Sequence, residues 1–269
     1  MLPYRATWEV AAVHPYVRCA LLSIALVAAA APAGALPTGY DVQIAVANSQ
    51  TGASMGGADL ASLMSAGVLT ETVDPVAGTT TLALNTVVAG PSGLWTIDEW
   101  DSTIDLDPFI TNNFTVTNNT AATLTYTIAV SSPIPAFNAD EIVQSTIQLR
   151  LLDSNGIGGA LVTSSAGTDV YEAFVNGSKA LGLLTDPFSL SCTDPIDCTI
   201  NGTAAAGVAS QAFGPAVATS IGLTITFDLT PGNSASILSR FELVPEPGTA
   251  LLVGIGLVGL AGARRHRRA

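Results

Sequence analysis

The sequence predicts an all-β fold: a single β-sandwich, for which a jelly-roll-like strand order is one form. Three observations favour it. Apolar residues recur at every second position over several short segments, as expected of strands with one buried face. Turn-forming residues separate these segments. Only 11% of the 269 residues are charged and 48% are hydrophobic, which is typical of an extracellular β-domain rather than a cytosolic enzyme.

The expected strands lie within residues 36–244, which we interpret as one domain. They cover residues 114–117, 124–131, 147–151, 221–229 and 237–243. A polar turn at residues 118–120 separates the first two, which are expected to pair as a hairpin. The main helix candidate is short: Asp59 caps one or two turns that carry Leu60 and Met64 and end at Gly67.

Residues 1–35 have the pattern of a secretory signal peptide. Arg18 precedes a short apolar run at residues 20–31, and Ala33-Gly34-Ala35 supplies the small residues of a cleavage site. A buried core helix is the alternative interpretation, and the flanking pattern favours the signal. The secretion machinery and signal peptidase are therefore expected partners.

Residues 249–263 form a second apolar run. A helix of this length spans about 22 Å, less than the roughly 30 Å of a bilayer core. Arginines that follow it extend its reach by snorkelling and stay cytoplasmic under the positive-inside rule; they are Arg264, Arg265, Arg267 and Arg268. We therefore expect a short transmembrane helix that anchors a precursor, with the preceding chain outside.

Pro245, Glu246 and Pro247 stand just before this run, and the two prolines favour an extended joint. Over residues 245–269 this motif, the apolar helix and the arginine tail at 264–269 together resemble the PEP-CTERM sorting signal. The resemblance implies recognition and processing by an exosortase, a membrane protease-transpeptidase of Gram-negative bacteria that make exopolysaccharide. It implies an exported protein: first an inner-membrane-anchored precursor, then a component of the cell surface or extracellular matrix.

The part of the chain between Pro37 and Pro245 is strongly acidic. Its basic residues are Arg150, Lys179 and Arg240, and they stand against nineteen Asp and Glu residues, a net charge of −16. Such a surface repels phosphate backbones, so nucleic acid is excluded as a partner.

Histidine is confined to the terminal segments, at His14 and His266. A mature domain without histidine has no Ser-His-Asp triad, no Cys-His pair and no histidine-ligated zinc. We therefore predict no catalytic residues, no cofactor and a non-enzymatic protein.

Cys192 and Cys198 are the two cysteines outside the signal segment. Two mature cysteines so close together in an exported protein are expected to form a disulfide. The short closed loop would contribute about 2 kcal/mol in the loop-entropy model.

An acidic cluster with two neighbouring tryptophans has two interpretations. Asp101, Asp105 and Asp107 supply the hard oxygens that calcium prefers, although a solvated acidic loop is the favoured explanation. Trp95 and Trp100 offer stacking surfaces for sugars if they are exposed, and belong to the sandwich core if they are not.

Three functions remain open. The first is a non-enzymatic surface or matrix protein associated with exopolysaccharide or biofilm. The second is a lectin-like carbohydrate-binding module, with or without calcium. The third, less favoured, is a secreted glycoside hydrolase that works through two carboxylates, for which the sequence designates no pair.

Overall fold

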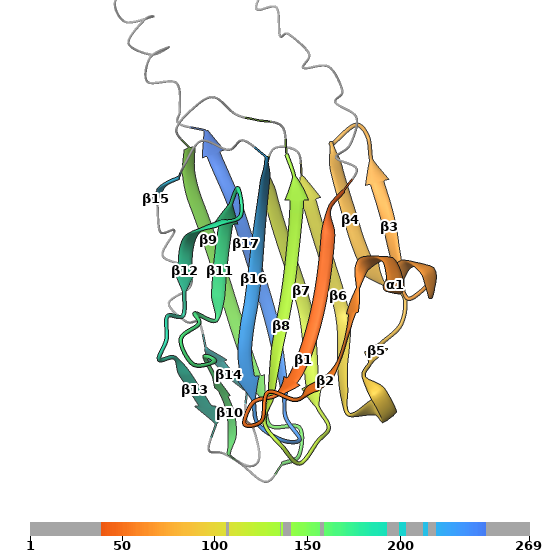
Figure 1. Ribbon diagram of the computed structural model, residues 1–269, viewed down its shortest axis with the longest axis vertical. Helices are drawn as coiled ribbons and strands as arrows, with labels where there is room; N and C mark the ends of the chain where they lie inside the picture. Colours follow the sequence, from red (N-terminus) through yellow and green to blue (C-terminus); the bar gives the residue numbers. More distant parts are fainter. Residues whose placement is uncertain are drawn as a thin grey trace, which may run out of the picture. The chain divides into compact units, whose positions relative to one another are not determined.

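The computed structural model describes residues 39–105, 108–134, 136, 141–156, 159–192, 199–202, 212–214 and 219–245. These residues form two antiparallel β-sheets, one short α-helix and a 3-10 turn (Figure 1), which confirms the all-β class and agrees with a β-sandwich. A jelly-roll-like order stays a prediction. The expected signal peptide and the tail from Glu246 onward lie outside the described residues. Within the described ranges, no helix is long and apolar enough to cross a membrane.

The first sheet has the order β12-β11-β16-β8-β1-β2, with β10 next to β16 and β13 next to β10. Its strands are β1 (Asp41–Asn48), β2 (Ser54–Asp59), β8 (Leu124–Pro133), β10 (Ala160–Thr163), β11 (Tyr171–Val175), β12 (Ser178–Leu183), β13 (Ser189–Cys192) and β16 (Ser220–Leu229). The clearest alternation in the sequence, at residues 221–229, is therefore a central strand of this sheet.

The second sheet has the order β14-β9-β17-β7-β6-β4-β3, with β15 beside β9 and β5 beside β6. Its strands are β3 (Leu69–Asp74), β4 (Thr79–Leu84), β5 (Val88–Ala89), β6 (Trp95–Asp105), β7 (Phe109–Asn118), β9 (Glu141–Leu152), β14 (Thr199–Gly202), β15 (Ala212–Gly214) and β17 (Ser234–Pro245). β17 is also a central strand: it pairs with β7 on one side and with β9 along its whole length on the other.

The core lies between the two sheets. Inward side chains of both sheets form one continuous apolar cluster, because alternate residues of each strand point to the same face. Two phenols bridge the layers: Tyr126 donates to the carbonyl oxygen of Thr117 at 2.9 Å, and Tyr171 donates to the Ser145 hydroxyl at 3.2 Å. Burial raises the pKa of both phenols, so each stays protonated and able to donate.

The expected hairpin between residues 114–117 and 124–131 is wrong. Both strands form, as β7 and β8, but β7 joins the second sheet and β8 joins the first. The connection at residues 118–124 crosses between the layers, so the apolar sides of the two strands face each other across the core. Alternation correctly indicated the buried side of each strand, but it does not reveal which strand each one pairs with.

The expected helix is present as α1 (Leu60–Ser65). Asp59 caps it by accepting a hydrogen bond from the Ser62 N–H at 2.7 Å, and the Ser62 hydroxyl accepts from the Asp59 N–H at 3.1 Å. The hydrogen bond from the Ser62 N–H to the Asp59 carboxylate lowers the pKa of Asp59. Leu63 is the buried residue and Leu60 packs against the core, as expected, whereas Met64 is exposed and does not belong to the apolar side.

The two ends of the described fold emerge at one end of the sheets. The connections from β7 to β8 and from β16 to β17 lie at the opposite end of the sheets (Figure 1). From there β8 and β17 both run toward the end where the described fold begins and finishes. Since β1 is antiparallel to β8, the first residues of β1 lie at the end where β17 finishes.

Candidate functional site

The sorting motif expected at residues 245–269 begins where a central strand finishes. Leu243 is buried and pairs with Val143 of β9, and Pro245, the last residue of β17, pairs with Glu141. Glu246, Pro247 and the four arginines of the tail lie outside the described residues. The start of the tail is thus joined to the interior of the second sheet without an intervening linker.

Trp95 is a core residue and not a binding platform. Its side chain is 1% exposed, and its indole N–H donates to the carbonyl oxygen of Met55 at 2.9 Å, which links β6 to β2 of the other sheet. A side chain on Gly90 would overlap the indole ring, so glycine at this position is a packing requirement.

Trp100 is likewise 2% exposed, and its ring lies 6.1 Å from that of Phe114 between centroids. Neither tryptophan presents a ring face to solvent, so neither can stack on a sugar. The structure supports the core interpretation of both residues and corrects the binding one.

A β-bulge explains how both tryptophans turn inward. The pairing of β6 with β7 shifts register between Asp98 and Asp101, and Glu99 takes a φ of 57° there. Before the bulge the buried positions are odd-numbered, as for Trp95, and after it they are even-numbered, as for Trp100. Strict alternation along the sequence does not reveal this change of phase.

The acids of this region point outward from the second sheet. Asp101 is exposed and Asp105 partly exposed, while Asp107 lies outside the described residues. Asp98 and Glu99 border a hollow of about 650 Å³ that Arg150 also lines. Within the described part of the chain no three acidic, histidine or cysteine side chains are grouped as a metal site, so the calcium alternative stays a sequence prediction.

Cys192 is buried at the end of β13. Its expected partner, Cys198, lies outside the described residues, so the disulfide between them stays a prediction.

A row of polar side chains crosses the inner face of the second sheet. Asn112 of β7 lies directly opposite Ser102 of β6 and Ser239 of β17 in the strand register, and all three are buried. The amide of Asn112 and the two hydroxyls have no hydrogen-bond partner in the described structure. Buried polar atoms without partners destabilise a fold, so this row is a weak point of the core.

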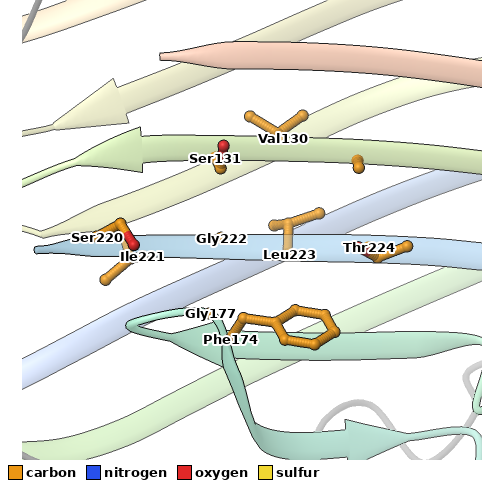
Figure 2. Close-up of a pocket in the computed structure, with 10 residues that line it drawn as sticks. Val130, Ser131, Phe174, Gly177, Ser220, Ile221, Gly222, Leu223 and Thr224 are labelled. Carbon is orange, nitrogen blue, oxygen red and sulfur yellow. The ribbon is translucent and has the colours of Figure 1, made fainter. Parts of the chain in front are cut away.

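The outward face of the first sheet carries a hollow that the sequence patterns did not indicate. It lies over β8, β16 and β11, has a volume of about 240 Å³, and has no charged lining residue. We call it the Phe174 groove; its outward-facing residues are Ala129, Ser131, Phe174, Ser220, Gly222 and Thr224. Figure 2 shows the Phe174 ring beside β16, with Gly222 presenting no side chain between Ser131 and Phe174.

The strand register builds this groove. Gly222 pairs with Phe174 on one side and Ser131 on the other, and Thr224 pairs with Ala129 and Glu172. Within β11 the neighbours of Phe174 are buried, so the ring points to the opposite, outward side. In the sequence, the only indication of this groove was that Phe174 lies two positions after Glu172, and therefore on the same side of a short strand.

One cation lies at the border of the groove. Lys179 is opposite Phe174 in the pairing of β11 with β12. Its ammonium group contacts Asp169 at 2.7 Å and Glu172 at 2.6 Å. Hydrogen bonds to these two carboxylates raise the pKa of Lys179, and the two acids offset its charge.

Comparisons with known proteins bear on the tail alone. Residues 243–268 match the family model described as the PEP-CTERM protein-sorting motif. A search of curated proteins found no match to the chain. The matched stretch begins at Leu243, inside β17, and includes the Pro-Glu-Pro sequence, the apolar run and the arginine cluster. The chain therefore carries a PEP-CTERM protein-sorting motif at its C-terminus, as the sequence indicated.

Proposed function

We propose that this protein is an exosortase-sorted component of the bacterial cell surface or extracellular matrix, with a non-enzymatic β-domain associated with exopolysaccharide or biofilm. The observation that carries the proposal is the continuity between β17 and the sorting motif. Because β17 is a central strand of its sheet, a sorting enzyme that acts on the tail acts on a segment that is joined directly to the folded domain.

The position of the two chain ends supports a precursor held at the inner membrane. The start of β1 and the end of β17 lie at the same end of the sheets. A domain held at the membrane through residues next to β1 and β17 would be held at this end, with its opposite end directed away from the membrane. The net charge of −16 between Pro37 and Pro245 keeps such a domain soluble and disfavours anionic partners.

Processing in a host that carries an exosortase tests this proposal. An epitope tag inserted at Gly52, an exposed turn residue with open space around it, marks the domain without touching either sheet. The wild type is compared with a variant in which Pro245, Glu246 and Pro247 are replaced by alanine. In the matched control, alanine replaces Pro75, which lies in an exposed turn between β3 and β4.

We expect the wild type and the control outside the cell, with intact masses that lack the N-terminal 35 residues or so and the arginine tail. The triple variant is expected to stay in the membrane fraction with its tail. If the wild type keeps its tail and stays in the membrane as the variant does, the segment is an ordinary anchor and the proposal is wrong.

Carbohydrate binding is a second candidate function, favoured by the Phe174 groove. The groove combines an outward aromatic ring with free hydroxyls and no charge, which is a combination suited to sugars. The glycoside hydrolase alternative stays a sequence prediction with no carboxylate pair assigned to it.

A further inference from the structure

We propose that the Phe174 groove binds an uncharged sugar ring, which stacks on Phe174 and accepts or donates hydrogen bonds at Ser131 and Thr224. This inference rests on the second candidate function above and gives it a site and a ligand class. The binding surface is then the outward face of the first sheet, and not the acidic, tryptophan-containing strand that the sequence pointed to.

Phe174 is the aromatic element of the site. Among the described strands of the first sheet, no other outward-facing residue is aromatic, since Tyr126, Tyr171 and Phe227 point into the core. Phe174 is only partly buried. An aromatic ring that stays partly in solvent gains by covering its face with the apolar C–H side of a sugar ring.

Gly222 keeps the space beside that ring open. Its backbone is not in the left-handed region, so the local conformation does not require glycine. Glycine inside a strand is otherwise unfavourable and is found where another group approaches the backbone closely. A Cβ at this position would lie 3.2 Å from the Cβ of Ser131 and would project into the groove between Ser131 and Phe174.

Two hydroxyls border the same space. Ser131 is exposed and Thr224 is partly exposed, and both line the groove. Neither side chain forms a hydrogen bond with another described residue. Hydroxyls that are free to donate and to accept match the hydroxyls of a sugar, whereas an aliphatic ligand would leave them without partners.

The charge distribution selects an uncharged ligand. No lining residue carries a charge, and the nearby Lys179 is held by Asp169 and Glu172. An anionic sugar would therefore meet no free cation at this groove and would be repelled by the acidic domain. The volume of about 240 Å³ is below that of pockets for drug-sized ligands, so the groove holds one ring of a longer chain.

Binding of neutral glycosides to the purified full chain tests the proposal. The probes are methyl glycosides of glucose, galactose, mannose and N-acetylglucosamine, with glucuronic acid as the charged comparison. Amide chemical shifts and calorimetry measure binding. We expect at least one neutral probe to bind and to shift the amides of Ser131, Phe174 and Gly222, and we expect no binding of glucuronic acid.

The substitutions test the aromatic ring and the hydroxyl of the groove separately. Phe174→Tyr keeps the ring and should bind as the wild type does, whereas Phe174→Leu keeps apolar surface but should weaken binding about tenfold. Thr224→Val removes one hydroxyl at constant shape and should weaken binding about threefold to tenfold. Phe109→Leu and Thr111→Val make the same changes on the outward face of the second sheet and should leave binding unchanged.

Each other result counts against the proposal in its own way. If no neutral probe binds, both the sugar site and the carbohydrate-binding function are wrong. If a probe binds but Phe174→Leu and Thr224→Val bind it as the wild type does, the function stands and the site lies elsewhere. Tighter binding of a neutral probe by Thr224→Val would show that the Thr224 hydroxyl does not bond to the sugar, and would overturn its place in the site. Melting temperatures of all variants verify that each is folded.

Discussion

Tyr126 on β8 donates its phenol hydrogen to the carbonyl oxygen of Thr117 on β7 at 2.9 Å, across the space between the two sheets. The bond sits next to the crossing at residues 118–124, where the sequence suggested a hairpin. It ties the two layers together at this crossing, because the donor belongs to one sheet and the acceptor to the other.

Tyr126→Phe should lower the free energy of unfolding by about 1–2 kcal/mol, because it leaves a buried carbonyl oxygen without its donor. Urea unfolding followed by circular dichroism measures the change. Tyr40→Phe is the control, since the Tyr40 phenol contacts Glu71 at the edge of the core, and it should cost less. Equal stability of wild type and Tyr126→Phe would mean that this bond does not hold the sheets together.

Ser239→Ala should stabilise the protein by about 1 kcal/mol, contrary to the usual effect of a core substitution, because its hydroxyl is buried without a partner. Ser145→Ala is the matched control: this serine is equally buried on the adjacent strand β9 but accepts the Tyr171 phenol. It should destabilise by about 1 kcal/mol. A loss of stability in both variants would show that Ser239 has a hydrogen-bond partner in solution.

Gly90→Ala should destabilise strongly, by about 3 kcal/mol, since the new methyl group would overlap the Trp95 indole. Gly52→Ala provides the comparison. Gly52 has a φ of +68° but open space around it, so only backbone strain of about 1–2 kcal/mol applies there. Thermal melting with tryptophan fluorescence measures both. A smaller effect at Gly90 than at Gly52 would show that Trp95 moves aside freely.

Asp228→Asn should stabilise the protein at neutral pH. Partial burial raises the pKa of Asp228 above its ordinary 3.8, although the carboxylate accepts a hydrogen bond from the Thr125 hydroxyl at 2.6 Å. The folded state thus binds the proton more tightly than the unfolded state, so this residue's contribution to stability falls as pH rises from about 3.8 through the folded pKa.

The advantage of Asp228→Asn should therefore be constant well above that window and disappear below it. Chemical unfolding at pH 3 and pH 7 measures the difference. The control is Asp41→Asn, also partly exposed, on β1 of the same sheet. If Asp228→Asn is less stable than wild type at pH 7, the bond from Thr125 outweighs the effect of burial.

The sequence predicted the strands better than their neighbours. Residues 221–229 and 237–243 are strands with the expected buried sides, because burial on one side of a strand imposes the alternation directly. Partner choice between β7 and β8 was wrong because both strands have the same pattern, and that pattern is satisfied in either sheet.

The site prediction was right for the tail motif, whose residues are neighbours in the sequence, and failed for the tryptophans, whose role depends on how side chains are arranged in space. The tail motif was found because its elements are contiguous, and the family match confirms it. Trp95 and Trp100 were considered as binding residues because of their acidic neighbours, but a bulge at Glu99 turns both inward. Phe174, Gly222 and Ser131 lie on three strands distant in the sequence, so no local pattern joins them.

The central position of β17 has a mechanical consequence. A pull on the tail acts along the axis of a strand that is held by β7 on one side and by β9 on the other. Such a load shears both ladders at once instead of opening hydrogen bonds one after another from an edge. A molecule fixed by this end would therefore be held through a strand that is paired on both sides, and would tolerate drag from flowing liquid or a moving polymer.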